Sequence, residues 1–138
     1  MRVMALDLGD ARTGIAFSDP MMIIANGYET YKKVNDEQDL NYVINLINEK
    51  EVGIVVVGLP INMDGTMGER VEKSKNFASR LKERLPNIQI EFMDERLTTV
   101  SAERVLIDAD VSREKRKKVV DKIAATIILQ AYLDKKNK

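Results

Sequence analysis

Alternating and continuous apolar runs along the chain predict five strands. They lie at 3–7, 14–17, 53–58 and 88–93, with a less regular stretch over 21–31. The polar and glycine residues at 9–13, between the first two runs, predict the turn of a β-hairpin. The β-branched run over 53–58 is bounded by glycines, which is typical of a strand covered on both faces of a parallel sheet.

Helical spacing of apolar residues predicts four helices. We expect them over 36–50, 69–85, 97–109 and about 117–133. The last is apolar nearly all round, and its polar arc consists of Lys122, Thr126 and Gln130. Asp121 falls outside this arc, so its carboxylate faces the packed side of the helix and requires a partner. The partner is either an arginine, Arg12 or Arg96, or a metal shared with other acids.

The order of these elements is strand, strand, strand, helix, strand, helix, strand, helix, helix. This order predicts an α/β fold in which an antiparallel hairpin is joined to parallel βαβ units. At 138 residues the chain is long enough to bury a core, and we expect a single domain over 1–138.

Composition restricts the chemistry. The chain has no Cys and no His, which excludes disulfides, thiolate or imidazole metal ligands and general-base histidine. A metal would therefore be held by oxygen, which favours Mg²⁺ or Mn²⁺. No apolar run is long enough to span a bilayer, and a cytoplasmic protein is expected.

Acidic residues follow two of the predicted core strands. Asp7 ends the first strand, and Asp94 and Glu95 end the strand at 88–93. Burying an ionised carboxylate costs roughly several kcal/mol of stability unless a cation or hydrogen bonds compensate for the lost hydration. Asp7 is therefore either a candidate functional acid or the cap of the following turn.

The longest predicted loop, 59–68, follows a core strand at the edge where α/β sheets bind ligands. Its segment Asp64, Gly65 and Thr66 forms either a tight turn or part of the site. Packing of the last helix across the sheet would bring Asp121 toward Asp7 and Glu95. Three carboxylates without histidine can hold divalent ions for displacement at phosphorus.

Four blocks of the sequence resemble the motifs of the YqgF/RuvX family, in the same order and over nearly the whole chain. They are Asp7-Leu8-Gly9 with Arg12 to Ala16 and Ser18-Asp19; Val57 to Pro60 with Asp64-Gly65-Thr66 and Gly68; Asp94 to Thr99; and Asp121 to Ala125 with Ile128 to Gln130 and Tyr132-Leu133. The family is similar to RuvC-type resolvases of the ribonuclease H-like superfamily.

The resemblance implies a ribonuclease H-like, mixed five-stranded sheet with an N-terminal antiparallel hairpin and helices on both faces. It further implies a metal-dependent nuclease with Asp7, Glu95 and Asp121 around Mg²⁺ or Mn²⁺. Asp7 and Asp121 would be metal ligands, and Glu95 a ligand or the group that orients the attacking water. Because successive strand residues point to opposite faces, one of Asp94 and Glu95 enters the site, and the resemblance favours Glu95.

Members of the family are described as Holliday junction resolvases and as nucleases that mature the 5′ end of 16S ribosomal RNA. The expected partner is thus a pre-ribosomal RNA, alone or in a precursor particle, or a branched DNA. Two alternatives remain beside RNA processing: a resolvase, and a non-catalytic RNA-binding assembly factor. An ATPase of the actin type shares the opening hairpin but needs two lobes, which this chain lacks. The protein is expected to be a monomer or a homodimer.

Basic residues fit an anionic substrate. The segment 113–138 carries nine Lys or Arg against three Asp or Glu, whereas 1–112 carries thirteen against nineteen. Phosphate contacts are expected from two arginines near the acids, a basic run and one lysine of the last helix. These residues are Arg12, Arg96, Arg113, Lys115, Arg116, Lys117, Lys118 and Lys122. The other interpretation of the basic run is a solvated start of the helix.

Overall fold

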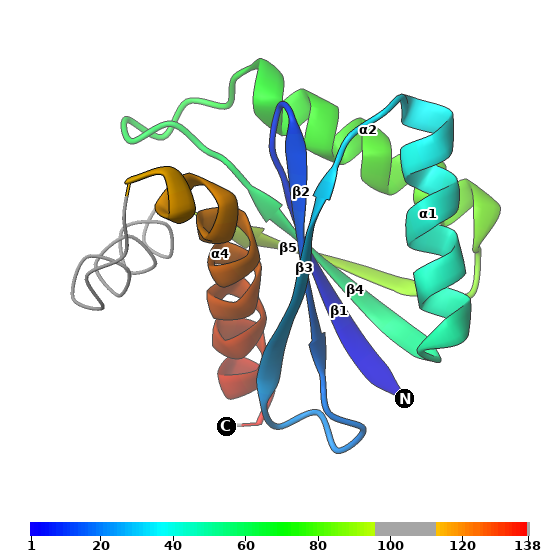
Figure 1. Cartoon of the computed structure of the whole chain (residues 1–138). Helices are drawn as coiled ribbons and strands as arrows, with labels where there is room; N and C mark the ends of the chain where they lie inside the picture. Colours follow the sequence, from blue (N-terminus) through cyan, green and yellow to red (C-terminus); the bar gives the residue numbers. More distant parts are fainter. Residues whose placement is uncertain (96–112, 138) are drawn as a thin grey trace.

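A computed structural model describes residues 1–95 and 113–137, and for residues 113–121 it describes the backbone alone. Within these ranges a five-stranded sheet is covered by helices (Figure 1). The predicted helix over 97–109 lies outside the described residues. The elements are β1 (Arg2–Leu8), β2 (Arg12–Ser18), β3 (Ala25–Lys32), α1 (Asp36–Glu49), β4 (Val52–Leu59), α2 (Glu69–Arg84), β5 (Gln89–Asp94) and α4 (Arg113–Lys136).

The sheet has the order β3-β2-β1-β4-β5. β1 is antiparallel to β2 and parallel to β4, β2 is antiparallel to β3, and β4 is parallel to β5. The hairpin β1–β2 is thus joined to two parallel units through β1 and β4, which confirms the mixed α/β sheet expected from the order of apolar runs. β1 lies at the centre, so its side chains are covered from both faces.

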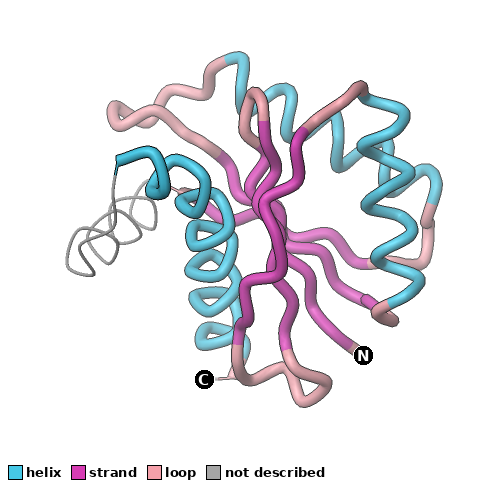
Figure 2. The backbone as a smooth tube through the Cα atoms, viewed as in Figure 1, coloured by secondary structure: helices cyan, strands magenta, loops and turns pink. Residues whose placement is uncertain are grey.

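Helices cover both faces of the sheet (Figure 2). On one face, α1 and α2 pack on a cluster that includes Met4, Leu6 and Val57. On the other face, α4 packs on Val3 and Ala5 and their neighbours. Alternate residues of β1 therefore enter different cores, because successive strand side chains point to opposite faces. Among the described residues, no helix combines the length and the apolar character needed to cross a membrane.

Two boundaries differ from the sequence-based prediction at the hairpin and the third strand. Arg12 and Thr13 belong to β2 rather than to the turn, because they pair with Lys32 and Tyr31 of β3. The third strand begins at Ala25 rather than at residue 21. Its predicted first residues instead form a turn around the Asp19 carboxylate.

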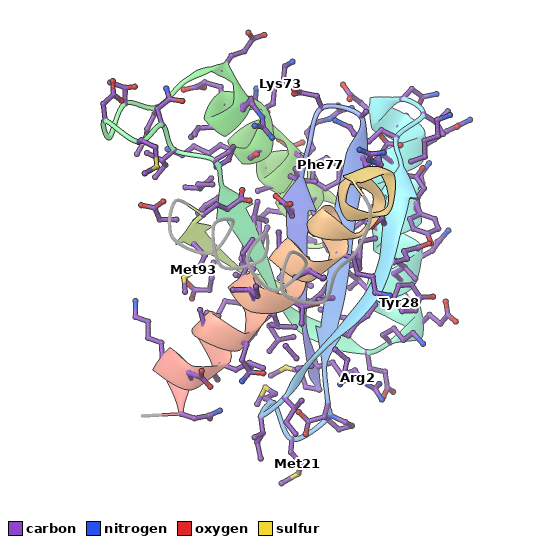
Figure 3. The ribbon with its side chains drawn as sticks, turned by 60° about the vertical axis from the view of Figure 1, so that its left-hand side comes forward. Arg2, Met21, Tyr28, Lys73, Phe77 and Met93 are labelled. Carbon is purple, nitrogen blue, oxygen red and sulfur yellow. The ribbon has the colours of Figure 1, made fainter. Side chains whose placement is uncertain are left out.

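The Asp19 carboxylate accepts hydrogen bonds from three backbone N–H groups of this turn. Oδ1 accepts from Ile23 and Ile24, each at 2.8 Å, and Oδ2 accepts from Met21 at 3.2 Å. These N–H groups are therefore not available to a β-ladder. Figure 3 shows Met21 projecting from this turn, and its exposed fraction is 73%.

The last helix begins at Arg113, four residues before the predicted start at Lys117. Apolar periodicity marks only the packed part of the helix, and the basic run before it consists of good helix formers that extend the same helix. The predicted polar arc of α4 faces β3 and the turn before it, since Lys122 and Thr126 lie over Gly27. Gln130 Oε1 accepts from the N–H of Ala25 at 2.9 Å, and Gln130 Nε2 donates to the carbonyl of Ile23 at 3.0 Å.

Candidate active site

Asp7 lies in β1 on the sheet face that α4 covers. It follows Val3 and Ala5 at alternate positions, and only 8% of it is exposed. Its partner in β2 is Gly14, and the register with β4, which pairs Leu6 with Val57, continues to Asp7 beside Gly58. Because glycine has no side chain, neither neighbouring strand covers the carboxylate.

Glu95 follows β5 and extends its pairing with β4, since its N–H donates to the carbonyl of Leu59 at 3.0 Å. The side chain is buried, with 6% exposed. It lies over Gly58: a Cβ at position 58 would come within 2.8 Å of Cγ and Cδ of Glu95 and of Cδ1 of Ile128 in α4. Glu95 therefore reaches across β4 toward Asp7 beneath α4.

Asp94 and Glu95 lie on opposite sides of β5. Met93 is partly buried against the core cluster that α4 covers, and Glu95, two residues further, is on the same face. Asp94, opposite Leu59 in the register, is exposed. Alternation along β5 thus places Glu95, and not Asp94, on the face that holds Asp7.

The third predicted acid, Asp121, belongs to α4 by its backbone, and its side chain lies outside the described residues. The same holds for the side chains of the basic run at 113–118, and Arg96 lies outside the described residues altogether. Among the side chains that the structure does describe, no group of three acids is close enough to hold a metal. Asp7 and Glu95 are the two predicted ligands that the fold brings to one face.

Two of the predicted phosphate-binding residues are described. Arg12 starts β2 two positions before Gly14, the partner of Asp7, so it lies on the same face toward the hairpin turn. The side chain of Lys122 lies over Gly27 of β3, where an added Cβ would come within 2.9 Å of Cε of Lys122. Arg12 is therefore the nearer of the two to Asp7 along the hairpin, and Lys122 lies over the outer strand.

The loop after β4 is folded on itself, as a tight turn. Asp64 Oδ1 accepts from the backbone N–H of Thr66 at 2.9 Å and from its hydroxyl at 2.7 Å, and these bonds lower the pKa of the Asp64 carboxyl. Gly65 takes a φ of 90°, which favours glycine. The loop lies at the same end of the sheet as the β1–β2 turn (Figure 1).

Gly58 is the residue of this site that sequence-based reasoning missed. The sequence marks it only as the boundary of an apolar run and as part of the second motif block, without indicating a contact with an acid. The available signal was a glycine directly at the carboxyl end of a core strand, a position where a backbone often has to be approached closely.

The mixed sheet, with two buried carboxylates at the carboxyl ends of β1 and β5, defines a RuvC-like member of the ribonuclease H class of folds. The solved structures agree. "T. thermophilus RuvC in complex with Holliday junction substrate" matches with a TM-score of 0.62 at 12% identity, over 99% of this chain and 96% of that chain. A fowlpox virus resolvase solved with Holliday junction DNA matches with a TM-score of 0.63 at 14% identity, over the full length of both chains.

The chain belongs to the RuvX family, whose model, described as "RuvX: Holliday junction resolvase", matches residues 1–135. Relatives of similar length confirm this. A protein of Syntrophomonas wolfei named "Putative pre-16S rRNA nuclease" is 52% identical over 134 residues, which are 97% of this chain and 94% of that protein. A protein of Halothermothrix orenii with the same name is 50% identical over 100% of this chain and 98% of its own length.

Proposed function

We propose that this protein is a metal-dependent endonuclease that processes the 5′ end of pre-16S ribosomal RNA in the cytoplasm. One observation carries the proposal: Asp7 and Glu95 are buried on the same face of the sheet, with Gly58 between their strands. Two buried acids so placed need a cation to offset their charge. The substrate is inferred from the two relatives that are 52% and 50% identical to this chain, because both are named as pre-16S rRNA nucleases.

The donor set fits Mg²⁺ or Mn²⁺, because both described acids offer oxygen ligands and the chain has no Cys or His. Asp121 would complete the set. Its position is four residues before Ala125 and seven before Ile128, which are buried, and this spacing places residues on one face of a helix. When bound, the metal would activate water and neutralise charge at the scissile phosphate.

The chain's own residues bind and orient the substrate. Arg12 would hold a phosphate oxygen of the strand that enters beside the hairpin turn, because it lies on the face of Asp7. Glu95, fixed between Gly58 and Ile128, would hold the metal or orient the attacking water. The basic run at 113–118, Lys122 and Arg96 would contact phosphates further along the nucleic acid, and the loop with Asp64 to Thr66 would border the site.

The test is cleavage by rigorously purified protein, with Mn²⁺ or with EDTA, of two labelled substrates: a pre-16S RNA fragment and a four-way DNA junction. The expected result is metal-dependent cutting of the RNA, lost in Asp7→Asn. Asp10→Asn, which changes an exposed acid of the same hairpin, serves as the matched control and retains cleavage.

Paired symmetric cuts in the junction, without cutting of the RNA, would show that the substrate is a branched DNA. The activity would then be the resolvase activity in the family's description. A resolvase would also need two sites related by two-fold symmetry, which the molar mass in solution would reveal. Binding of RNA without cutting under any metal condition would overturn the enzyme and leave an assembly factor.

A further inference from the structure

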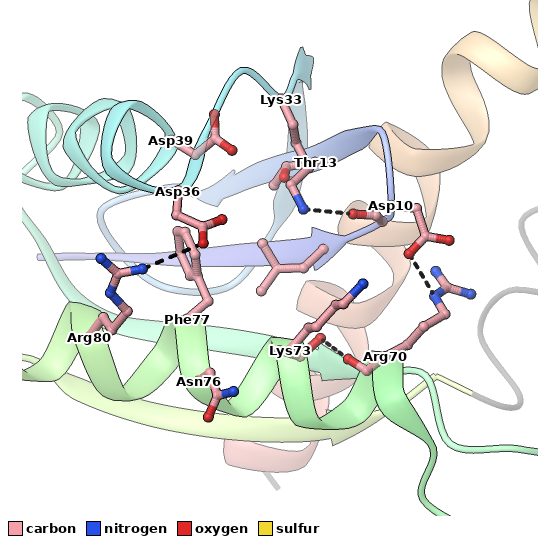
Figure 4. A pocket seen from close by; sticks show the side chains of 13 residues that line it. Asp10, Thr13, Lys33, Asp36, Asp39, Arg70, Lys73, Asn76, Phe77 and Arg80 are labelled. Atoms are coloured by element: carbon pink, nitrogen blue, oxygen red, sulfur yellow. Dashed lines mark hydrogen bonds and ion pairs between the residues drawn. The ribbon is translucent and has the colours of Figure 1, made fainter.

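A cleft lies on the sheet face opposite the carboxylates. It has a volume of about 250 Å³ and is bordered by the β1–β2 turn, the β3–α1 connection and α2. Leu8 contributes to its apolar surface. Phe77 of α2 contributes as well (Figure 4). Because Asp7 points to the α4 face, this cleft is separate from the candidate active site, although both are near the same hairpin turn.

An ion pair closes each end of the cleft. At one end Arg70 Nε lies 3.8 Å from Oδ1 of Asp10, and at the other Arg80 Nη1 lies 3.6 Å from Oδ2 of Asp36 (Figure 4). These pairs join α2 to the hairpin turn and to the start of α1. Both are largely exposed and contribute little stability. Their guanidinium groups keep further N–H donors for a ligand.

Two ammonium groups reach the middle of the cleft. Lys33 and Lys73 approach it from opposite walls (Figure 4). Lys33 Nζ donates to the carbonyl of Gly9 at 3.2 Å, and within the described part of the chain it has no carboxylate partner. Among the described residues, Lys73 forms an ion pair with Glu69 of its own helix alone, at 3.6 Å on an exposed surface. Each ammonium therefore retains donors that can serve an anion.

Buried polar groups form the back of the cleft. Asp39 is 4% exposed and Thr13 3% exposed. Asp39 Oδ1 accepts from the Tyr31 hydroxyl at 3.0 Å and from the N–H of Val34 at 2.9 Å, so this carboxylate is fixed. A rigid acceptor, a hydroxyl and two ammonium groups around an apolar floor are the features of a small-molecule site.

The ligand must carry a compact anion and a body that both contacts apolar surface and donates hydrogen bonds. A phosphate satisfies the first condition, because ammonium and guanidinium groups bind its oxygens as charge-assisted donors. A nucleoside satisfies the second, because its base packs on Phe77 and its hydroxyls or amino groups donate to Asp39 and Asp36. The volume suits one nucleotide and is too small for a duplex.

We propose that this cleft binds one nucleoside monophosphate, as a free nucleotide or as a 5′-phosphorylated end of an RNA strand, with the phosphate between Lys33 and Lys73. The cleft carries four basic and three acidic side chains, so its charge is nearly balanced. Further phosphates would approach Asp10 or Asp36. The site therefore prefers a monophosphate to a triphosphate.

Titration calorimetry of the full chain without metal tests the proposal, with AMP, adenosine, ATP and inorganic phosphate as probes. AMP is expected to bind more tightly than adenosine or phosphate, and ATP no more tightly than AMP. The double variant Lys33→Gln with Lys73→Gln should weaken AMP binding about tenfold or more. The control double variant Lys75→Gln with Lys135→Gln, which changes two exposed lysines outside the cleft, should bind AMP as the natural chain does.

A short single-stranded RNA with and without a 5′-phosphate separates the two sources of the ligand. A gain from the 5′-phosphate that disappears in the Lys33 and Lys73 variant assigns the cleft to an RNA end, and AMP binding without such a gain assigns it to a free nucleotide. If AMP binds no more tightly than adenosine, or equally well to the double variant, the proposal is wrong. None of these readouts depends on cleavage, so the result is independent of the proposed nuclease activity.

Discussion

Glu95 lies directly on Gly58, with so little space that a Cβ at position 58 would come within 2.8 Å of two carbon atoms of the Glu95 side chain. The same Cβ would meet Cδ1 of Ile128 at 2.8 Å. Gly58 therefore links the position of a candidate catalytic acid to the packing of α4 on β4.

Replacing Gly58 by alanine should impair both activity and stability. The added methyl group must displace Glu95 or Ile128, and overpacking of this kind costs about 1–3 kcal/mol. The measurements are urea denaturation and RNA cleavage at a temperature at which the variant is folded. The control is Gly68→Ala, where the new Cβ meets only Nδ2 of Asn62 at an ordinary 3.5 Å, and this variant should keep its activity. Equal activity of the two variants would contradict the packing argument.

Glu95→Gln should lower metal-dependent cleavage by about 100-fold or more, the size of effect seen when one group that stabilises a transition state is removed. Asp94→Asn, on the exposed side of the same strand end, should change cleavage little. Each variant removes one negative charge from the end of β5. A difference in cleavage between the two variants therefore reports which face of the strand carries the acid, and not the loss of charge. A larger loss in Asp94→Asn would assign the second acid to Asp94.

Changing Lys115, Arg116 and Lys117 together to glutamine should weaken nucleic-acid binding and flatten its salt dependence. Each lost phosphate contact reduces the slope of log K against log salt by up to about 0.9. Binding isotherms at several salt concentrations measure the slope. Lys135→Gln with Lys136→Gln, in the last turn of the same helix, should leave it unchanged. An unaltered slope in the triple variant would remove the basic run from the interface.

Asp19 should make stability depend on pH. Hydrogen bonds from the N–H groups of Ile24, Ile23 and Met21 lower the pKa of the Asp19 carboxyl below its usual 3.8. A carboxyl with a depressed pKa in the folded state stabilises the fold above its unfolded pKa, and this stabilisation is lost as the pH falls through the folded value.

This dependence is checked by measuring the urea denaturation midpoints of the natural chain and of the Asp19→Asn variant between pH 7 and pH 2.5. The natural chain should be more stable than the variant at pH 7, and the difference should shrink below about pH 3.8. A difference that is constant over the whole range would show that the carboxylate charge does not support the turn.

The sequence was sufficient to predict most of the sheet, because β1, β2, β4 and β5 each carry an apolar run. β3 carries no such run, and none of its residues is fully buried. Boundaries were less predictable where tertiary contacts decide them. Met21 to Ile24 are apolar enough for a strand, yet the Asp19 carboxylate accepts from the N–H groups of Met21, Ile23 and Ile24, and the Asp19 carbonyl accepts from that of Met22. Arg12 and Thr13 are polar enough for a turn, yet pairing with β3 makes them part of β2.

In the candidate site, too, some features could be predicted from the sequence and others depend on tertiary contacts. Acids at the ends of apolar runs are visible in the sequence, and alternation along β5 could be anticipated from it. The space over Gly58 depends on how β4, β5 and α4 meet, which no local pattern records. The cleft with Lys33 and Lys73 was not predicted either, because its walls come from a turn, a connection and a helix face, each with an ordinary solvated pattern.

The contacts of α4 have a consequence for synthesis on the ribosome. Gln130 and Asn137 bind the backbone at 22–25, across more than one hundred residues of sequence. The first strands therefore leave the exit tunnel long before the helix that covers them. Until α4 emerges, Asp7 and the apolar residues beside it lack the cover that this helix gives them. The proposed nuclease site therefore forms only after α4 has been synthesised, more than one hundred residues after β1.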